Sequence, residues 1–128
     1  MTESNRDLMR RYGEAWSAGD YAGMQDLMDD GVVLHLFGRS PLAGTFKGKE
    51  DLAGIVRIIQ DLTDRTLLEI HDMLVSDEHA VALVRERMGR HDESLELERV
   101  FVYHFREGRI GEIWIYDQDQ AAIDAMWS

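Results

Sequence analysis

One histidine stands in a short, mainly apolar run that is expected to form a strand. His35 alternates with Val33 and Phe37, while Leu34 and Leu36 belong to the opposite face of the same run. Imidazole changes its charge near neutral pH, so His35 is a candidate proton donor or acceptor in a pocket. The alternative is a hydrogen-bonded histidine in the core or in an interface.

An aspartate closes the last apolar run of the chain. Asp117 follows the segment 109–116, and burial at a cavity mouth would raise the pKa of its carboxyl toward a range useful for acid/base chemistry. Asp119 is expected to cap the helix that follows. A β-bulge inserts one extra residue into a strand, and the residues after it then point to the opposite face of the sheet. The sequence therefore leaves open which of the two carboxylates faces inward. A solvated carboxylate at a strand end is the alternative for Asp117.

Aromatic residues recur along the predicted elements at positions that suit the wall of a cavity for a planar, hydrophobic ligand; ordinary core packing is the alternative for each of them. The candidates for substrate binding are Trp16, Phe37, Tyr103, Phe105, Trp114 and Tyr116. The sequence has no HExxH motif, paired cysteines or dense carboxylate pattern, and no glycine-rich nucleotide loop. We therefore expect neither a metal nor another cofactor.

Helical periodicity is found in four places. A helix is predicted from the capping residues Ser4 and Asn5 to Gly19, and a short second helix from Asp20 to near Gly31. A third is predicted over 48–64 and a fourth after residue 119. The loop GRSPLAG, at 38–44, is expected to lack regular structure.

Strand-like runs occupy 32–37 and, after residue 66, the segments 66–76, 80–89, 95–106 and 109–117. Short turn sequences separate the last three, so these are expected to pair as antiparallel hairpins. Helices first and a meander later predict one α+β domain over residues 1–128, with the helices packed on one face of the sheet.

Composition narrows the possible partners. The chain has 128 residues, no cysteine, and 25 acidic against 14 basic residues, a formal net charge of −11. This acidity disfavours nucleic acid and anionic membranes as partners. No apolar run is long enough to span a membrane and no signal-like segment opens the sequence, so the expected location is the cytoplasm.

Four segments, in this order and spacing, resemble the SnoaL-like branch of the NTF2-like superfamily, which is related to ketosteroid isomerases. They are RRYGEAWSAGDYAGMQDLMDDGV, GRSPLAGTFKGKEDL, HDMLVSDEHAVALV and FREGRIGEIWIYDQDQ. The resemblance implies a cystatin-like cone, in which helices wrap a strongly curved, mostly antiparallel sheet around a hydrophobic pocket. It also implies a homodimer formed through the sheet.

Tyr12 matches the tyrosine with which ketosteroid isomerases donate a hydrogen bond to the substrate oxyanion. The other two isomerase positions are occupied by Leu36, in place of the general-base aspartate, and Tyr103, in place of the protonated aspartate. The resemblance therefore does not extend to 3-oxosteroid isomerisation.

SnoaL-type cyclases supply a second comparison, in which a histidine on the penultimate strand and an aspartate after the last strand do the chemistry. His104 and Trp114 match this pattern. The aspartate position is Gln118, flanked by Asp117 and Asp119. Asp117, His104, His35 and Tyr12 are thus the candidate catalytic residues.

Three functions stay open at this stage. The first is a cofactor-free isomerase, cyclase or lyase that transfers protons on a small hydrophobic carbonyl compound. The second is a non-catalytic ligand-binding domain, and the third is a dimerisation module whose cavity is filled by its own side chains. A pocket of about 300 Å³ or more with a buried carboxyl or imidazole would favour the enzyme.

Overall fold

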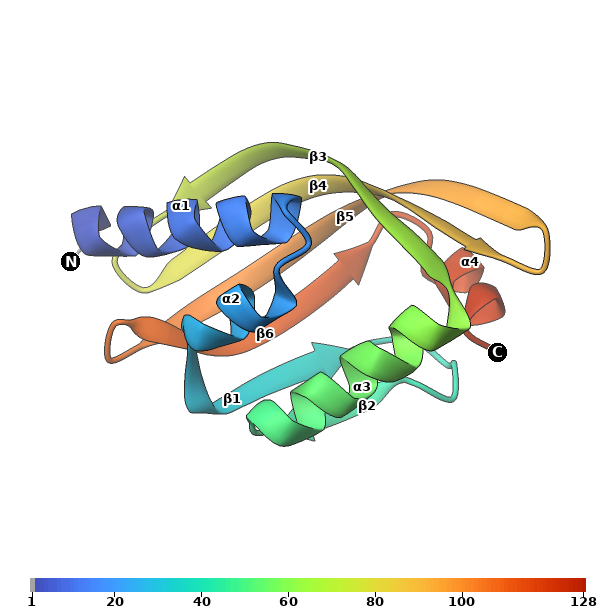
Figure 1. Ribbon diagram of the computed structural model, residues 1–128, viewed down its shortest axis with the longest axis horizontal. Coiled ribbons are helices and arrows are strands. Elements are labelled where there is room, and N and C mark those ends of the chain that lie inside the picture. The colour runs from blue at the N-terminus through green and yellow to red at the C-terminus, as the bar shows by residue number, and fades with distance from the viewer. Residues whose placement is uncertain (1) are drawn as a thin grey trace.

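The computed structural model describes residues 2–128 and contains four helices and six strands (Figure 1). The helices are α1 (Thr2–Ser17), α2 (Tyr21–Asp26), α3 (Lys49–Leu62) and α4 (Gln120–Met126). The strands are β1 (Met28–Leu36), β2 (Gly44–Lys47), β3 (Asp64–Val75), β4 (His79–Arg90), β5 (Glu93–Arg106) and β6 (Arg109–Asp117).

The four predicted helices and the four long C-terminal strands are confirmed, and so are three of the expected helix boundaries. Gly19 ends the first helical segment with a φ of +71°, a conformation that residues other than glycine rarely adopt. Asp20 caps α2 by accepting a hydrogen bond from Gly23 N at 2.9 Å. Asp119 caps α4 in the same way, accepting from Ala122 N at 3.0 Å.

The structure corrects two predicted boundaries near the N-terminus. The second helix ends at Asp26 and not near Gly31, because Met28 already pairs with Ile110 of β6 at the start of β1. Helix α1 begins at Thr2, ahead of the predicted capping residues. The side chain of Asn5 is buried and donates hydrogen bonds to the backbone carbonyls that follow β3, so tertiary contacts and not a helix cap explain this residue.

The sequence did not predict β2, a four-residue strand that pairs with β1 in antiparallel register, Val33 opposite Lys47. It lies at the edge of the sheet, and its side chains are mostly exposed, so no apolar alternation signals it.

The six strands form one sheet in the order β2-β1-β6-β5-β4-β3. All neighbouring pairs are antiparallel except β1 and β6. The two-residue turns between β4 and β5 and between β5 and β6 have positive φ values at both central positions, as tight hairpins require. The predicted hairpins are therefore confirmed.

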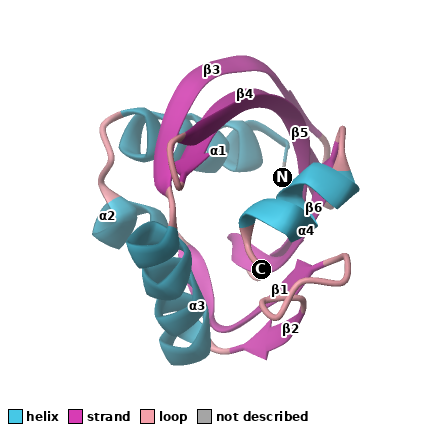
Figure 2. Cartoon of the chain, turned by 90° about the vertical axis from the view of Figure 1, so that its right-hand side faces the viewer, coloured by secondary structure: helices cyan, strands magenta, loops and turns pink. Residues whose placement is uncertain are grey.

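The sheet curls strongly, and α1, α2 and α3 lie on its hollow side (Figure 2). The α4 helix lies at the end of the molecule where β6 ends (Figure 1). The expected α+β cone is thereby confirmed. No helix in the described part of the chain has the length and apolar character that crossing a membrane requires.

Candidate functional site: an interior cavity and a buried ion-pair network

An interior cavity of about 80 Å³ lies between the hollow face of the sheet and the helices. Its wall is mainly apolar. It is lined by Tyr12, Trp16, Tyr21, Met24, Gln25, Met28, Leu34, Leu36, Leu52, Val56, Ile59, Arg65, Arg99, Phe101, Ile113, Ile115 and Trp127. This volume exceeds what a single water needs and falls below the roughly 300–1,000 Å³ of sites for drug-sized ligands.

The cavity approaches the surface between α2 and α3. Tyr21 is exposed there, and Gln25 and Val56 are half-buried, whereas most of the other lining residues are buried. The most exposed part of the cavity lining therefore lies on these two helices.

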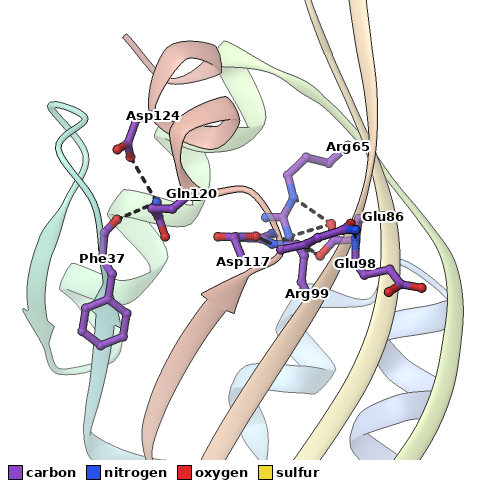
Figure 3. Close-up of polar contacts among 9 residues, drawn as sticks. Phe37, Arg65, Glu86, Glu98, Arg99, Asp117, Gln120 and Asp124 are labelled. Atoms are coloured by element: carbon purple, nitrogen blue, oxygen red, sulfur yellow. Dashed lines mark hydrogen bonds and ion pairs between the residues drawn. The ribbon is translucent and has the colours of Figure 1, made fainter.

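Four charged side chains form a buried network on the hollow side of the sheet (Figure 3). Glu86 accepts hydrogen bonds from Arg65 Nη2 at 2.9 Å and from Arg99 Nη1 at 3.3 Å. Arg99 also donates to Asp117, from Nε to Oδ1 at 2.5 Å and from Nη2 to Oδ2 at 3.4 Å. The side chains of Glu86, Arg99 and Asp117 are at most 4% exposed. Buried charges of this kind are tolerated only when they are paired, as they are here.

Strand alternation brings these charges together. Arg99 takes an inward position on β5 next to Phe101, and Glu86 and Asp117 take inward positions on the two neighbouring strands. The guanidinium carbon of Arg99 lies 5.3 Å from the centroid of the Phe101 ring and 5.9 Å from that of Trp127. Cation–π contacts therefore add to the ion pairs in fixing the orientation of Arg99.

The charged residues that line the cavity are arginines, and no aspartate or glutamate is among the lining residues. Arg65 and Arg99 line it, whereas Glu86 and Asp117 contact it only through these arginines. We call Arg65, Arg99 and Trp127 the polar end of the cavity. Guanidinium and indole groups only donate hydrogen bonds, so this end can bind an oxygen acceptor.

Trp127 carries a buried donor without an acceptor. The residue is 4% exposed, and among the described residues its indole Nε1 has no hydrogen-bond partner. Leaving a buried donor unpaired costs about 1–3 kcal/mol.

Two buried tyrosines form a pair beside the apolar wall. The hydroxyl of Tyr103 donates to that of Tyr12 at 3.4 Å, and their rings meet edge to face with centroids 5.2 Å apart. Burial raises the pKa of Tyr12 to about 12, and it also raises the pKa of Tyr103 well above the ordinary value. Both hydroxyls are therefore protonated at neutral pH, and Tyr12, which lines the cavity, can donate to a bound oxygen.

The predicted catalytic residues lie in different surroundings. Tyr12 lines the cavity, and Asp117 points inward but is bonded to Arg99. Asp119 caps α4. The catalytic roles of Tyr12 and Asp117 stay predictions.

His35 and His104 lie on the outer face of the sheet. Leu34, Leu36, Tyr103 and Phe105, their neighbours along the strands, are buried inside, so alternation turns both histidines outward. Nε2 of His35 lies 2.5 Å from Glu112 Oε2. The ring of His104 lies against His79, with centroids 5.0 Å apart. Neither histidine lines the cavity.

The predicted aromatic residues divide between the two faces. Trp16 lines the cavity, and Tyr103 is buried beside it. Phe37, Trp114 and Tyr116 lie on the outer face, because they alternate with inward residues of β1 and β6, and so they are not part of the cavity wall. There they form, with His35, a stack that we call the outer aromatic stripe; successive ring centroids are 5.2–6.4 Å apart.

Sequence reasoning missed Arg65, Glu86, Arg99 and Trp127. A signal for two of these residues, Glu86 and Arg99, was present, because each occupies an inward position in an apolar alternation. Glu86 follows Ala82 and Val84 at two-residue spacing, and Arg99 follows Leu97. A charged residue at such a position on adjacent strands indicates a buried ion pair. Among the described residues, no group of three or more His, Cys, Asp or Glu side chains is arranged to hold a metal ion.

Comparison with known proteins agrees with this architecture. The uncharacterized protein Rv0034 of Mycobacterium tuberculosis is 25% identical over an alignment of 128 positions that covers 98% of each chain. Bal32a, from a soil-derived mobile gene cassette, is 26% identical with a TM-score of 0.84, over 99% of this chain and 98% of the other. TerC, crystallised with polyporic acid, has a TM-score of 0.83 at 14% identity, over 96% and 97% of the two chains. Further structural neighbours are described as having a cystatin-like fold or as NTF2-like.

The model of the SnoaL-like domain matches residues 9–113, which includes the C-terminal part of α1, all of α2 and α3, and the sheet as far as the middle of β6. The predicted resemblance is therefore confirmed, and the chain belongs to the SnoaL-like domain family.

Proposed function

We propose that the protein binds a small, mainly apolar molecule in its interior cavity, with an oxygen atom of the ligand at the polar end. The observation that carries this proposal is the composition of the wall, in which apolar side chains surround a buried end whose charged and indole groups are all donors. Such a wall suits a ligand with an apolar body and one or a few acceptor atoms.

The volume of the cavity sets the size of what fits without rearrangement. At about 80 Å³ it accommodates a small ligand, and a larger one requires side chains to move. The flexible side chains of Met24 and Met28 form part of the wall, and methionine adapts its shape readily. TerC, a protein with the same fold, was crystallised with polyporic acid, which is consistent with a small-molecule ligand in this family.

Proton-transfer catalysis in the same cavity is the second candidate function. It is supported by Asp117, which is one hydrogen bond away from the cavity-lining Arg99, and by the protonated hydroxyl of Tyr12. Each carboxylate oxygen of Asp117 accepts a hydrogen bond from Arg99. A carboxylate paired in this way accepts a proton from a substrate less readily than an unpaired one. Binding is for this reason the better-supported function.

A thermal-shift screen with steroids, aromatic polyketides and aromatic acids tests the binding proposal. A ligand that binds only the folded state raises Tm in proportion to its concentration relative to Kd. Val56→Phe adds volume to the cavity wall, and Val102→Phe adds the same volume on the outer face. We expect hits to stabilise the wild type and Val102→Phe but not Val56→Phe. Equal shifts in both variants would place binding outside the cavity.

The same hits separate a binder from an enzyme. Each is incubated with the wild type, Asp117→Asn and Tyr12→Phe, and the products are examined by mass spectrometry and NMR. A binding protein returns the compound unchanged from all three samples. Conversion by the wild type that is lost in Asp117→Asn, with binding retained, would instead establish the acid/base role of Asp117.

We also propose that two copies associate through the outer aromatic stripe. Phe37 and Tyr116 are 40% and 49% exposed although their rings stack, with centroids 5.2 Å apart. Exposed aromatic clusters of this kind are typical of protein interfaces.

A further inference from the structure

Two histidines lie directly opposite each other on the outer face of the sheet, at the end away from α4 (Figure 1). His79 opens β4, and His104 lies near the end of β5. The carbonyl of His79 accepts from Ser76 N at 2.8 Å, on the side of β3, while Phe105 N donates to the Glu78 carbonyl at 3.0 Å. The two histidines therefore form a cross-strand pair without hydrogen bonds of its own, the kind in which side chains are closest. Their imidazole rings meet, with centroids 5.0 Å apart.

No other side chain holds these two rings. His79 is exposed and His104 half-buried, and among the described residues neither imidazole has a hydrogen-bond partner. His35 differs in this respect, because its ring nitrogens contact Glu112 and Thr45. A neutral imidazole has a nitrogen lone pair, which is a good ligand for transition metals. Two such donors are thus side by side and uncommitted.

The separation of the rings suits two ligands of one metal ion. With metal–nitrogen bonds of about 2.0–2.1 Å, each ring centroid lies about 3.2 Å from the metal, and two imidazoles at a tetrahedral angle then have centroids about 5.2 Å apart. The observed distance of 5.0 Å is close to this value. The terminal torsion of histidine is broad, so rotation of the unbonded rings can turn one nitrogen of each toward a common point.

The charges nearby favour a cation. Glu112 on β6 is directly opposite His104, so His104 lies between an imidazole on one side and a carboxylate on the other. The basic side chain nearest along β5 is Arg106, which is paired with Asp29 at 3.9 Å. The whole chain carries a formal net charge of −11, which raises the local concentration of cations.

We propose that His79 and His104 bind a divalent transition-metal ion such as Zn²⁺ or Cu²⁺, with the remaining coordination positions left to water or to the Glu112 carboxylate. Two histidine ligands are fewer than a closed structural site has, so the ion would keep open positions. The site lies outside the cavity and is independent of the ligand proposed there. Sequence motifs predicted no metal because these ligands come from two strands, and only the strand register joins them.

Calorimetric titration of the full chain, without a histidine tag, tests the site. ZnCl₂ is the probe, and MgCl₂ is the control for unspecific binding to the acidic surface, because Mg²⁺ prefers oxygen ligands. The variants are His79→Asn and His104→Asn. His91→Asn is matched to them, since His91 lies in the β4–β5 turn with a φ of +54°, which asparagine tolerates.

We expect one Zn²⁺ per chain and no comparable binding of Mg²⁺. Loss of either ligand should weaken Zn²⁺ binding at least about 10-fold, since even the loss of groups that only support a ligand costs about 10- to 100-fold. His91→Asn should bind as the wild type does. Electron paramagnetic resonance of the Cu²⁺ complex should show coupling to two imidazole nitrogens in the wild type and to one in either variant.

Four results would overturn the site. They are unchanged Zn²⁺ affinity in both His79→Asn and His104→Asn, equal binding of Mg²⁺, and coupling of Cu²⁺ to fewer than two nitrogens in the wild type, a measurement that needs no variant to fold. The fourth is half a Zn²⁺ per chain with metal-dependent association in sedimentation, which would mean that the ion bridges two chains. Loss of binding in His35→Asn alone would instead place the ion at His35 and Glu112.

Discussion

Arg99 donates hydrogen bonds to both carboxylate oxygens of Asp117, at 2.5 Å and 3.4 Å, and it is Arg99 that lines the cavity. An aspartate that sequence reasoning assigns to acid/base chemistry thus also serves as the counter-ion of a buried arginine. Replacing Asp117 should lower the stability of the fold through Arg99, and it should lower catalytic turnover only if Asp117 is an acid or base. Measuring both quantities therefore separates the two roles.

Asp117→Asn should lower the free energy of unfolding by about 3–5 kcal/mol, because it leaves the buried charge of Arg99 without one of its two partners. Urea denaturation measures the change. The matched control is Glu96→Gln, which breaks the exposed pair with Arg87 and should cost less than about 1 kcal/mol. Equal effects of the two substitutions would show that Glu86 alone neutralises Arg99.

Alkaline pH should destabilise the protein through the buried tyrosine pair. The ordinary pKa is 10.0, and the pKa of Tyr12 in the folded chain is about 12. Below pH 10 both states keep the proton and stability is unaffected. Between pH 10 and 12 the unfolded chain loses it while the folded chain does not, so stability falls by about 1.4 kcal/mol per pH unit for each such tyrosine.

Urea denaturation between pH 8 and 11.5 measures this slope. Replacing Tyr12 and Tyr103 together by phenylalanine should flatten it, because neither position then binds a proton in either state. Tyr116→Phe, at an exposed position on the outer face, is the control and should keep the wild-type slope. A slope that survives in the double variant would have to arise from other groups.

The fold could be predicted from the sequence to a greater extent than the site. The strand-like runs between 66 and 117 and the helix cap Asp119 were predicted from local sequence patterns, as was the cap Asp20, and the structure contains all of them. The edge strand β2 depends on its pairing with β1 and has no pattern of its own.

The site depends on which face of each strand turns inward, and alternation alone does not decide that. Leu34 and His35 could exchange faces without changing the pattern of the sequence, and only the closed sheet shows that the leucine is inside. The pairing of Arg99 with Asp117 likewise requires the register of β5 and β6, in which these residues are directly opposite.

The hydrogen bonds that hold α4 to the loop after β1 should be sensitive to a substitution of Gly38, which has a φ of +104°. A Cβ at this position would overlap the carboxylate of Asp124 and lie 2.5 Å from Gln120 Nε2, the groups that hold the loop to α4. Gly38→Ala should therefore lose these hydrogen bonds in addition to straining the backbone. Gly19→Ala is the matched control, with a φ of +71° and no atom within 4 Å of the added Cβ.

Chemical denaturation should show Gly19→Ala destabilised by about 1–2 kcal/mol, the cost of left-handed backbone for a residue with a Cβ. Gly38→Ala should lose about 1–3 kcal/mol more, for two hydrogen bonds of α4. It should also alter the NMR signal of the Trp127 indole N–H, since Trp127 directly follows α4. Equal stabilities and an unchanged indole signal would show that α4 is held by its apolar contacts alone.

Self-association should depend on the outer aromatic stripe. The double variant Phe37→Ser/Tyr116→Ser removes two exposed rings, while Leu74→Ser removes an exposed apolar side chain of similar accessibility at the other edge of the sheet. If the stripe pairs two copies, the dimer buries these rings, and losing two aromatic contacts at an interface centre weakens it by about 2 kcal/mol or more. Sedimentation equilibrium should then give a dimer for the wild type and for Leu74→Ser, with Kd raised at least about 30-fold in the double variant. A wild-type monomer at all concentrations, or a dimer that the double substitution leaves intact, would show that the stripe does not hold two copies together.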